Sequence, residues 1–163
     1  MRRVAIFFMC CLLFSIQAQV LPALFHTNWL PNAILTTIVT ITLFKGHQTG
    51  LISAVIGGGM QDILISNFFG LHIFPYVLII YALSIVQHRM YEERWYWTCI
   101  LVAIATVLDG LIRIVMISAS GGDISFFAYL WYMVLPTVFW NAFIGAVIHN
   151  IMKYTQERED YIW

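Results

Sequence analysis

Charge is what this sequence has least of. Only 10% of its 163 residues are acidic or basic, whereas a soluble domain carries roughly 25%. Hydrophobic residues make up 61% of the chain, so there is too little polar surface to cover a globule in water. This composition excludes an ordinary soluble protein and favours an integral membrane protein.

The sequence also lacks the patterns of most enzymes and of nucleic-acid-binding proteins. Eight basic residues balance eight acidic ones, so no basic surplus is available to neutralise phosphates. Cys10, Cys11 and Cys99 have neither zinc nor redox spacing, and the five histidines form no ligand pair at helical spacing. We find no nucleophile–base pair and no phosphate-binding loop in the sequence. We therefore expect no catalytic residue, no metal, no cofactor and no nucleic acid.

Long apolar runs are what the sequence has most of. Six such segments lie near residues 4–24, 31–44, 49–64, 71–86, 97–118 and 126–152. A spanning helix needs about 20 residues, so the second and third segments must extend into their flanks or sit in a thinned bilayer. The first segment resembles a signal peptide, but "SIQAQ" lacks a small-x-small cleavage pair, and we interpret it as a retained helix. The sequence thus predicts one all-α transmembrane domain over residues 1–163, a six-helix bundle.

The basic residues predict the orientation of this bundle. Seven of the eight lie on one side of the predicted bundle: Arg2, Arg3, Lys45, Arg89, Arg94, Lys153 and Arg158. The alternate connections "FHTNW", "SNFFG" and "ASGGDIS" contain no basic residue. Cytoplasmic loops carry the excess of Lys and Arg, so both termini are predicted to be cytoplasmic.

A stripe of small residues runs along the third segment. Gly50, Ala54, Gly58 and Asp62 recur every four residues and share one helix face. Small residues at this spacing let another helix approach closely, either inside the bundle or on a partner protein. A carboxylate within the membrane must be paired or wetted, so Asp62 should face the protein interior or a partner.

A second polar set combines with Asp62. Asp109 and Arg113 are four residues apart in the fifth segment, and Asn32 opens the second. Counting about 1.5 Å per residue places Asn32, Asp62, Asp109 and Arg113 at similar depth, so they could form one buried cluster. The cluster could fix helix register, with Asp62 paired to Arg113, or it could contact a partner or ligand. An ion path fits less well, because one arginine beside two carboxylates neutralises them.

The order of these motifs resembles the MreD family of rod shape-determining proteins. "LPNAIL" opens the second segment, Gly58-x-x-x-Asp62 follows, and then come "FFGLHIFPYVLIIYAL" and the aspartate of the fifth segment. The resemblance extends over nearly the whole chain, in length, six segments and short loops. The positions that match the family motif are Pro31, Asn32, Gly58, Asp62, Gly70 and Asp109.

This resemblance implies a non-enzymatic scaffold in the bacterial cytoplasmic membrane. MreD-like proteins bind MreC and work with RodA, a class B penicillin-binding protein and, indirectly, MreB in the peptidoglycan synthesis that controls cell shape. Their fold is similar to the substrate-binding subunits of energy-coupling-factor vitamin transporters. The alternative that this likeness implies is a subunit for small-molecule uptake.

Overall fold

The computed structural model describes residues 31–64, 66, 69–90, 94–123 and 125–160. Within these ranges every regular element is a helix, which confirms the all-α prediction. The elements are α3 (Ala33–Lys45), α4 (His47–Leu64), α5 (Ile73–Met90), α6 (Trp95–Ala119), α7 (Phe126–Tyr129), the π-helical turn η2 (Leu130–Val134) and α8 (Leu135–Asp160). The predicted helix 4–24 lies outside the described residues.

The helix bounds differ from the predicted segments mainly at two ends. α5 continues to Met90 rather than residue 86, and the last segment continues to Asp160 rather than residue 152. By length and composition, Trp95–Ala119 and Phe126–Thr155 could each cross a membrane, whereas Ala33–Lys45 and Ile73–Ile85 are shorter apolar helices. The count of six spans therefore stays a prediction.

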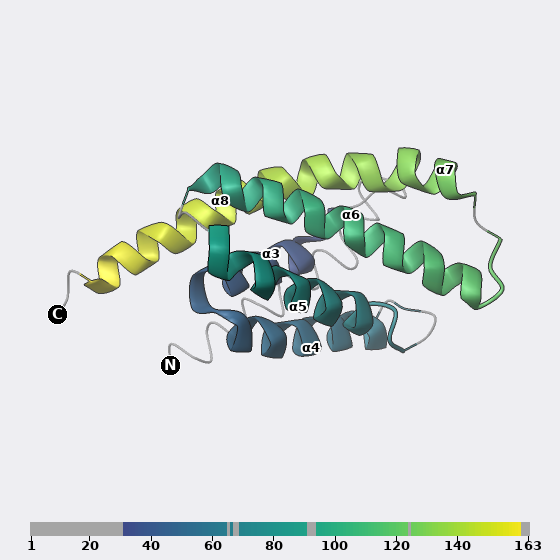
Figure 1. Ribbon diagram of the computed structural model, residues 1–163, viewed down its shortest axis with the longest axis horizontal. Coiled ribbons are helices and arrows are strands. Elements are labelled where there is room, and N and C mark those ends of the chain that lie inside the picture. The colour runs from purple at the N-terminus through teal and green to yellow at the C-terminus, as the bar shows by residue number, and fades with distance from the viewer. Residues whose placement is uncertain (1–30, 65, 67–68, 91–93, 124, 161–163) are drawn as a thin grey trace.

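α3 lies at the centre of the described bundle. α6 and α8 lie side by side, α4 and α5 lie together on the other side, and α3 touches all four (Figure 1). Its 13 residues rise roughly 20 Å, which is less than the hydrocarbon core of about 30 Å. Leu35 and Val39 are fully buried on it. A helix this short begins inside the bundle, so its first turn needs polar partners at that depth.

Threonines make the centre of α3 polar in composition without leaving polar groups unpaired. The hydroxyls of Thr36, Thr40 and Thr42 each donate to the backbone carbonyl four residues earlier, at 2.7 to 3.0 Å. All three residues have no exposed surface. Because the hydroxyl is satisfied within its own helix, its small side chain can pack against neighbouring helices as an apolar group would.

The small-residue stripe of α4 faces the interior. A Cβ on Gly58 would lie 2.8 Å from the Cα of Ile73, and one on Gly50 would collide with the Thr42 side chain. Ala54 is fully buried between them along the stripe. The sequence left two uses of the stripe open, packing inside the bundle or against a partner protein. These contacts show that the stripe packs against other helices of the same chain. The first turn of α5 and the last turn of α3 fill the groove.

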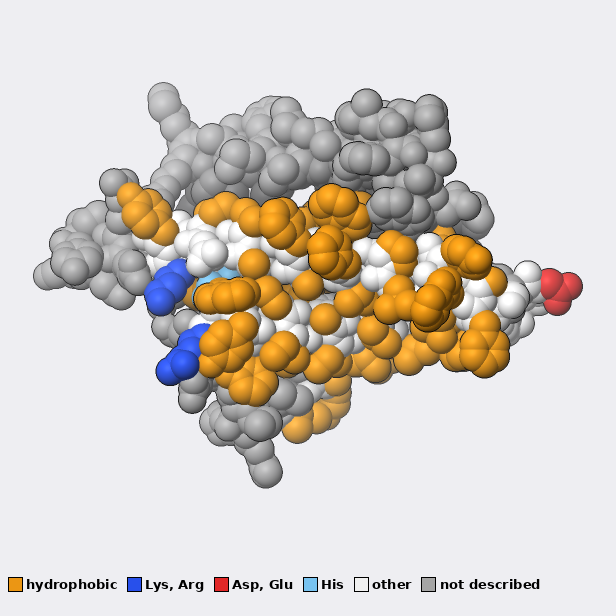
Figure 2. Space-filling model, turned by 90° about the horizontal axis from the view of Figure 1, so that it is seen from above, with side chains coloured by type: hydrophobic (Ala, Val, Ile, Leu, Met, Phe, Trp, Pro, Cys, Tyr) orange, Lys and Arg blue, Asp and Glu red, His pale blue; other side chains and the backbone are white. Residues whose placement is uncertain are grey.

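Large apolar side chains cover the outside. On α4, Ile52, Val55, Ile56 and Ile63 are all more than half exposed, on the side away from the stripe. Figure 2 shows hydrophobic side chains along the length of one face, with Lys and Arg at one end and an acidic side chain at the opposite end. This distribution is typical of a surface that lies in lipid between two charged margins.

The close approach at Gly58 can be tested against its neighbour. Gly58→Ala should lower the free energy of unfolding by about 1–3 kcal/mol, because the new methyl group meets the backbone of α5 rather than a movable side chain. In Gly59→Ala the methyl group would lie 3.6 Å from Ile73 Cδ1, an ordinary contact, and alanine is the better helix former by roughly 0.5–1 kcal/mol. Thermal unfolding in detergent should therefore shift down for the first variant and not for the second. Equal shifts would contradict the packing described here.

Candidate functional site

Asp62 ends the small-residue stripe and caps the next helix. Its carboxylate accepts hydrogen bonds from the backbone N–H groups of Gly70 at 2.8 Å, His72 at 2.8 Å and Ile73 at 3.2 Å. Ile73 is the first residue of α5, and Gly70 supplies the positive φ of 105° that turns the chain back. Asp62 is only 4% exposed. The carboxylate thus satisfies donors that the start of α5 would otherwise leave unpaired in an apolar medium.

His72 connects this cap to α6. Its Nδ1 lies 2.9 Å from Asp62 Oδ1, and its Nε2 lies 2.8 Å from Arg113 Nη1. A guanidinium can only donate, so Nε2 must accept and the ring proton must be on Nδ1, from which it is donated to Asp62. Ser66 Oγ also donates to Asp62 Oδ1, at 3.1 Å. A neutral imidazole therefore links the α4–α5 turn to α6.

Arg113 pairs with Asp109 and not directly with Asp62. Its Nε donates to Asp109 Oδ2 at 2.9 Å, and the side chains are 15% and 10% exposed, respectively. The hypothesis of a direct Asp62–Arg113 pair is wrong, because the His72 ring occupies the space between them. Each charged group instead has a nearer partner, and the four side chains form a chain in the order Asp62, His72, Arg113 and Asp109.

Asn32 belongs to a second, neighbouring network. Its backbone N–H donates to Asn141 Oδ1 at 2.7 Å, and its side-chain amide donates to the Tyr76 hydroxyl at 2.5 Å. The Tyr76 hydroxyl in turn donates to Gln61, and the Asn141 amide donates to Thr106 Oγ1 at 3.0 Å. These contacts connect the start of α3 to α4, α5, α6 and α8 at one level of the bundle.

A cavity of about 160 Å³ opens beside both networks. It is lined by Asn32, Thr106, Asp109, Gly110, Arg113, Tyr129, Met133, Val134 and Thr137. Two ionic atoms of these lining residues, Asp109 Oδ1 and Arg113 Nη2, have no hydrogen-bond partner in the part of the chain that the structure describes, and both are covered by protein rather than open to the cavity. Buried polar atoms are rarely left unpaired, so these two atoms are an exception within the polar networks.

The structure brings together only part of the predicted site. Asp62, Asp109 and Arg113 lie in one chain of contacts, and Asn32 lies in the adjoining network and on the cavity wall. Gly50 and Ala54 lie further along α4. Pro31 and Gly70 precede α3 and α5, respectively.

Six polar residues of these networks were not predicted as site residues: Gln61, Ser66, His72, Tyr76, Thr106 and Asn141. Only the position of Gln61 beside Asp62 gave a signal in the sequence.

Comparison with protein families bears on the role of this bundle. A family model described as rod shape-determining protein MreD matches residues 1–156. The chain belongs to the MreD family. Comparisons with curated proteins and with solved structures gave no match. Membership of MreD, a family of membrane proteins, gives the chain a role in rod-shape determination.

The capping role of Asp62 predicts a large effect from a small change. Asp62→Asn replaces one acceptor oxygen by an amide that points its own hydrogens at backbone donors. It should cost about 3 kcal/mol or more, as breaking a buried ionic contact does. Ser66→Ala removes one hydroxyl donor from the same carboxylate and should cost about 1 kcal/mol. Thermal unfolding of both variants in detergent measures the difference, and a smaller loss for Asp62→Asn would contradict the cap.

Proposed function

We propose that this chain is a non-enzymatic, multi-pass scaffold of the bacterial cell-elongation machinery, that it binds MreC in the cytoplasmic membrane and that it supports lateral peptidoglycan synthesis. The observation that carries the proposal is the match to the MreD family over residues 1–156. RodA and a class B penicillin-binding protein are proposed to join this assembly, with MreB linked indirectly. The family match gives no support to the alternative, a vitamin-uptake subunit.

The buried polar groups favour a structural role for most of the site. Asp62, His72, Arg113 and Asp109 bond to one another, and Asp62 also bonds to the backbone at the start of α5, so the contacts join α4, α5 and α6. Such contacts are directional, so they fix how far each helix can slide or rotate against the next. A scaffold needs this property, because its outer surface must keep one shape for a partner to recognise.

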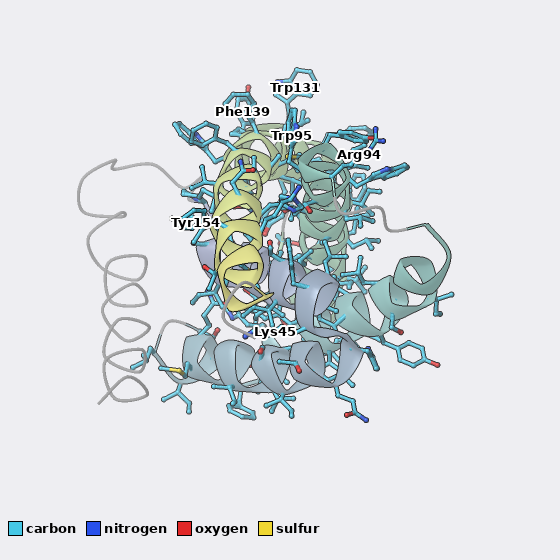
Figure 3. All side chains as sticks on the ribbon, turned by 90° about the vertical axis from the view of Figure 1, so that its left-hand side faces the viewer. Lys45, Arg94, Trp95, Trp131, Phe139 and Tyr154 are labelled. Carbon is cyan, nitrogen blue, oxygen red and sulfur yellow. The ribbon has the colours of Figure 1, made fainter. Side chains whose placement is uncertain are left out.

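An aromatic surface on α7–η2–α8 is a proposed place for a partner helix. Phe127, Trp131, Leu135 and Phe139 are spaced four residues apart, and all are at least half exposed. Figure 3 shows Trp131 and Phe139 pointing away from the bundle. Large, rigid aromatic side chains bury much area against a neighbour, and the membrane helix of MreC would meet them within the bilayer.

Copurification tests the proposed partnership. The tagged chain is coexpressed with MreC from the same genome and purified in mild detergent. MreC should be retained in near-stoichiometric amount, because a scaffold contact survives dilution. An unrelated single-span membrane protein, expressed at the same level, is the control and should be lost. Loss of MreC together with retention of an ATPase module would contradict the proposal.

The orientation can be tested by cysteine labelling in cells. On a background without Cys10, Cys11 and Cys99, a cysteine at Ser120 should react with an impermeant reagent from outside. One at Lys153 should react only after the membrane is opened, since both positions are exposed but lie at opposite ends of the bundle. Labelling of position 153 in intact cells would contradict cytoplasmic termini.

A further inference from the structure

α6 and α8 run antiparallel, and their contacts follow one register (Figure 1). In this register, four residues forward on α6 correspond to four residues back on α8. It holds at three contacts, which are Thr98 with His149, Val102 with Gly145 and Thr106 with Asn141. The next position in the same register, one turn nearer the start of α6, places Arg94 opposite Lys153.

Arg94 and Lys153 therefore stand at the same level on neighbouring helices, and both are exposed. Arg94 is the N-cap residue of α6, and its guanidinium carbon lies 6.0 Å from the centre of the Tyr96 ring. Figure 2 shows Lys and Arg side chains close together at this end of the molecule. Like charges on facing helices repel each other, so an anion that binds between them lowers the free energy of this end.

Each of the two cations is followed by an exposed aromatic residue. Trp95 is 57% exposed and Tyr154 is 60% exposed. Figure 3, which looks onto this end of the bundle, shows Arg94 and Trp95 close together and Tyr154 on the side of α8. Exposed Trp and Tyr side chains are typical of the boundary between membrane and water, where the lipid headgroups lie. The two cations are thus at the level of lipid phosphates.

We propose that Arg94 and Lys153 together bind the phosphate of an anionic phospholipid, such as phosphatidylglycerol, in the leaflet at this end of the bundle. Both side chains have long, flexible stems, and both donate charge-assisted hydrogen bonds to phosphate oxygens. A zwitterionic headgroup brings a positive charge of its own, so it fits this pair less well. The acidic residues Glu157, Glu159 and Asp160 follow Lys153 by four to seven residues, which is roughly 6–10 Å further along α8 and away from the lipid. The inference goes beyond the proposed scaffold and does not depend on MreC.

Native mass spectrometry of the delipidated full chain can measure the lipid preference. Phosphatidylglycerol and phosphatidylethanolamine with the same acyl chains are offered in equal amounts. The wild type should retain the glycerol lipid about 20-fold better, because each cation near an anionic headgroup contributes roughly fivefold. A wild type without this preference would overturn the proposal, and that result needs no variant to fold. Thermal stabilisation by soluble glycerol phosphate without a lipid preference would overturn the assignment to a lipid.

Three variants at exposed positions locate the binding. Arg94→Gln and Lys153→Gln should each lower the preference about fivefold. Lys45→Gln is the matched control, because Lys45 is also an exposed cation at this end but belongs to α3, outside the α6–α8 register. It should keep the wild-type preference. Thermal unfolding in detergent checks that all three variants remain folded. Equal losses in all three would indicate a general attraction to positive charge, and an unchanged preference in Arg94→Gln or Lys153→Gln would place the lipid elsewhere. Either result would overturn the proposal.

Discussion

The Asp62 carboxylate at the first turn of α5 is the contact on which the described bundle depends. In an apolar medium the backbone N–H groups of a helix start need acceptors, and a carboxylate needs donors. Asp62 and the N–H groups of Gly70, His72 and Ile73 satisfy one another. Gly58 lies one turn earlier and lets the Ile73 backbone come close. Gly58 and Asp62 therefore act together: Gly58 permits the close approach of the α5 backbone, and Asp62 stabilises it.

This arrangement determines where the remaining charges can go. Since Asp62 accepts three backbone donors, Arg113 is not needed to neutralise it, and the neutral His72 ring can lie between them. Arg113 is then held on one side by His72 and on another by Asp109, and its last nitrogen, Nη2, is buried without a hydrogen-bond partner among the described residues. The unpaired atoms are thus a consequence of how α4 and α5 are joined, and they lie where α6 meets the π-helical turn before α8.

The sequence predicted the parts of this arrangement that repeat along one helix. Gly50, Ala54, Gly58 and Asp62 share a face by spacing alone, and so do Asp109 and Arg113. The all-helical fold followed from the apolar runs and from the scarcity of charge. His72 could not be predicted, because nothing in its spacing connects it to Arg113, 41 residues later. Asn141 could not be predicted either, because its contact with the Asn32 backbone depends on how α3 crosses α8.

The polar layer and the apolar surface have complementary roles in a membrane protein. Lipid offers no hydrophobic force to press helices together, so close packing and buried hydrogen bonds must hold them. The buried hydrogen bonds gather at the start of α3. There Asn32 is linked to four other helices, α4, α5, α6 and α8, through Gln61, Tyr76, Thr106 and Asn141, respectively. The outer side chains are therefore not needed to hold the helices together, and they can face lipid or a partner. The turn before α8 is the exception, because it supplies Met133 and Val134 to the cavity wall and Trp131 to the aromatic surface.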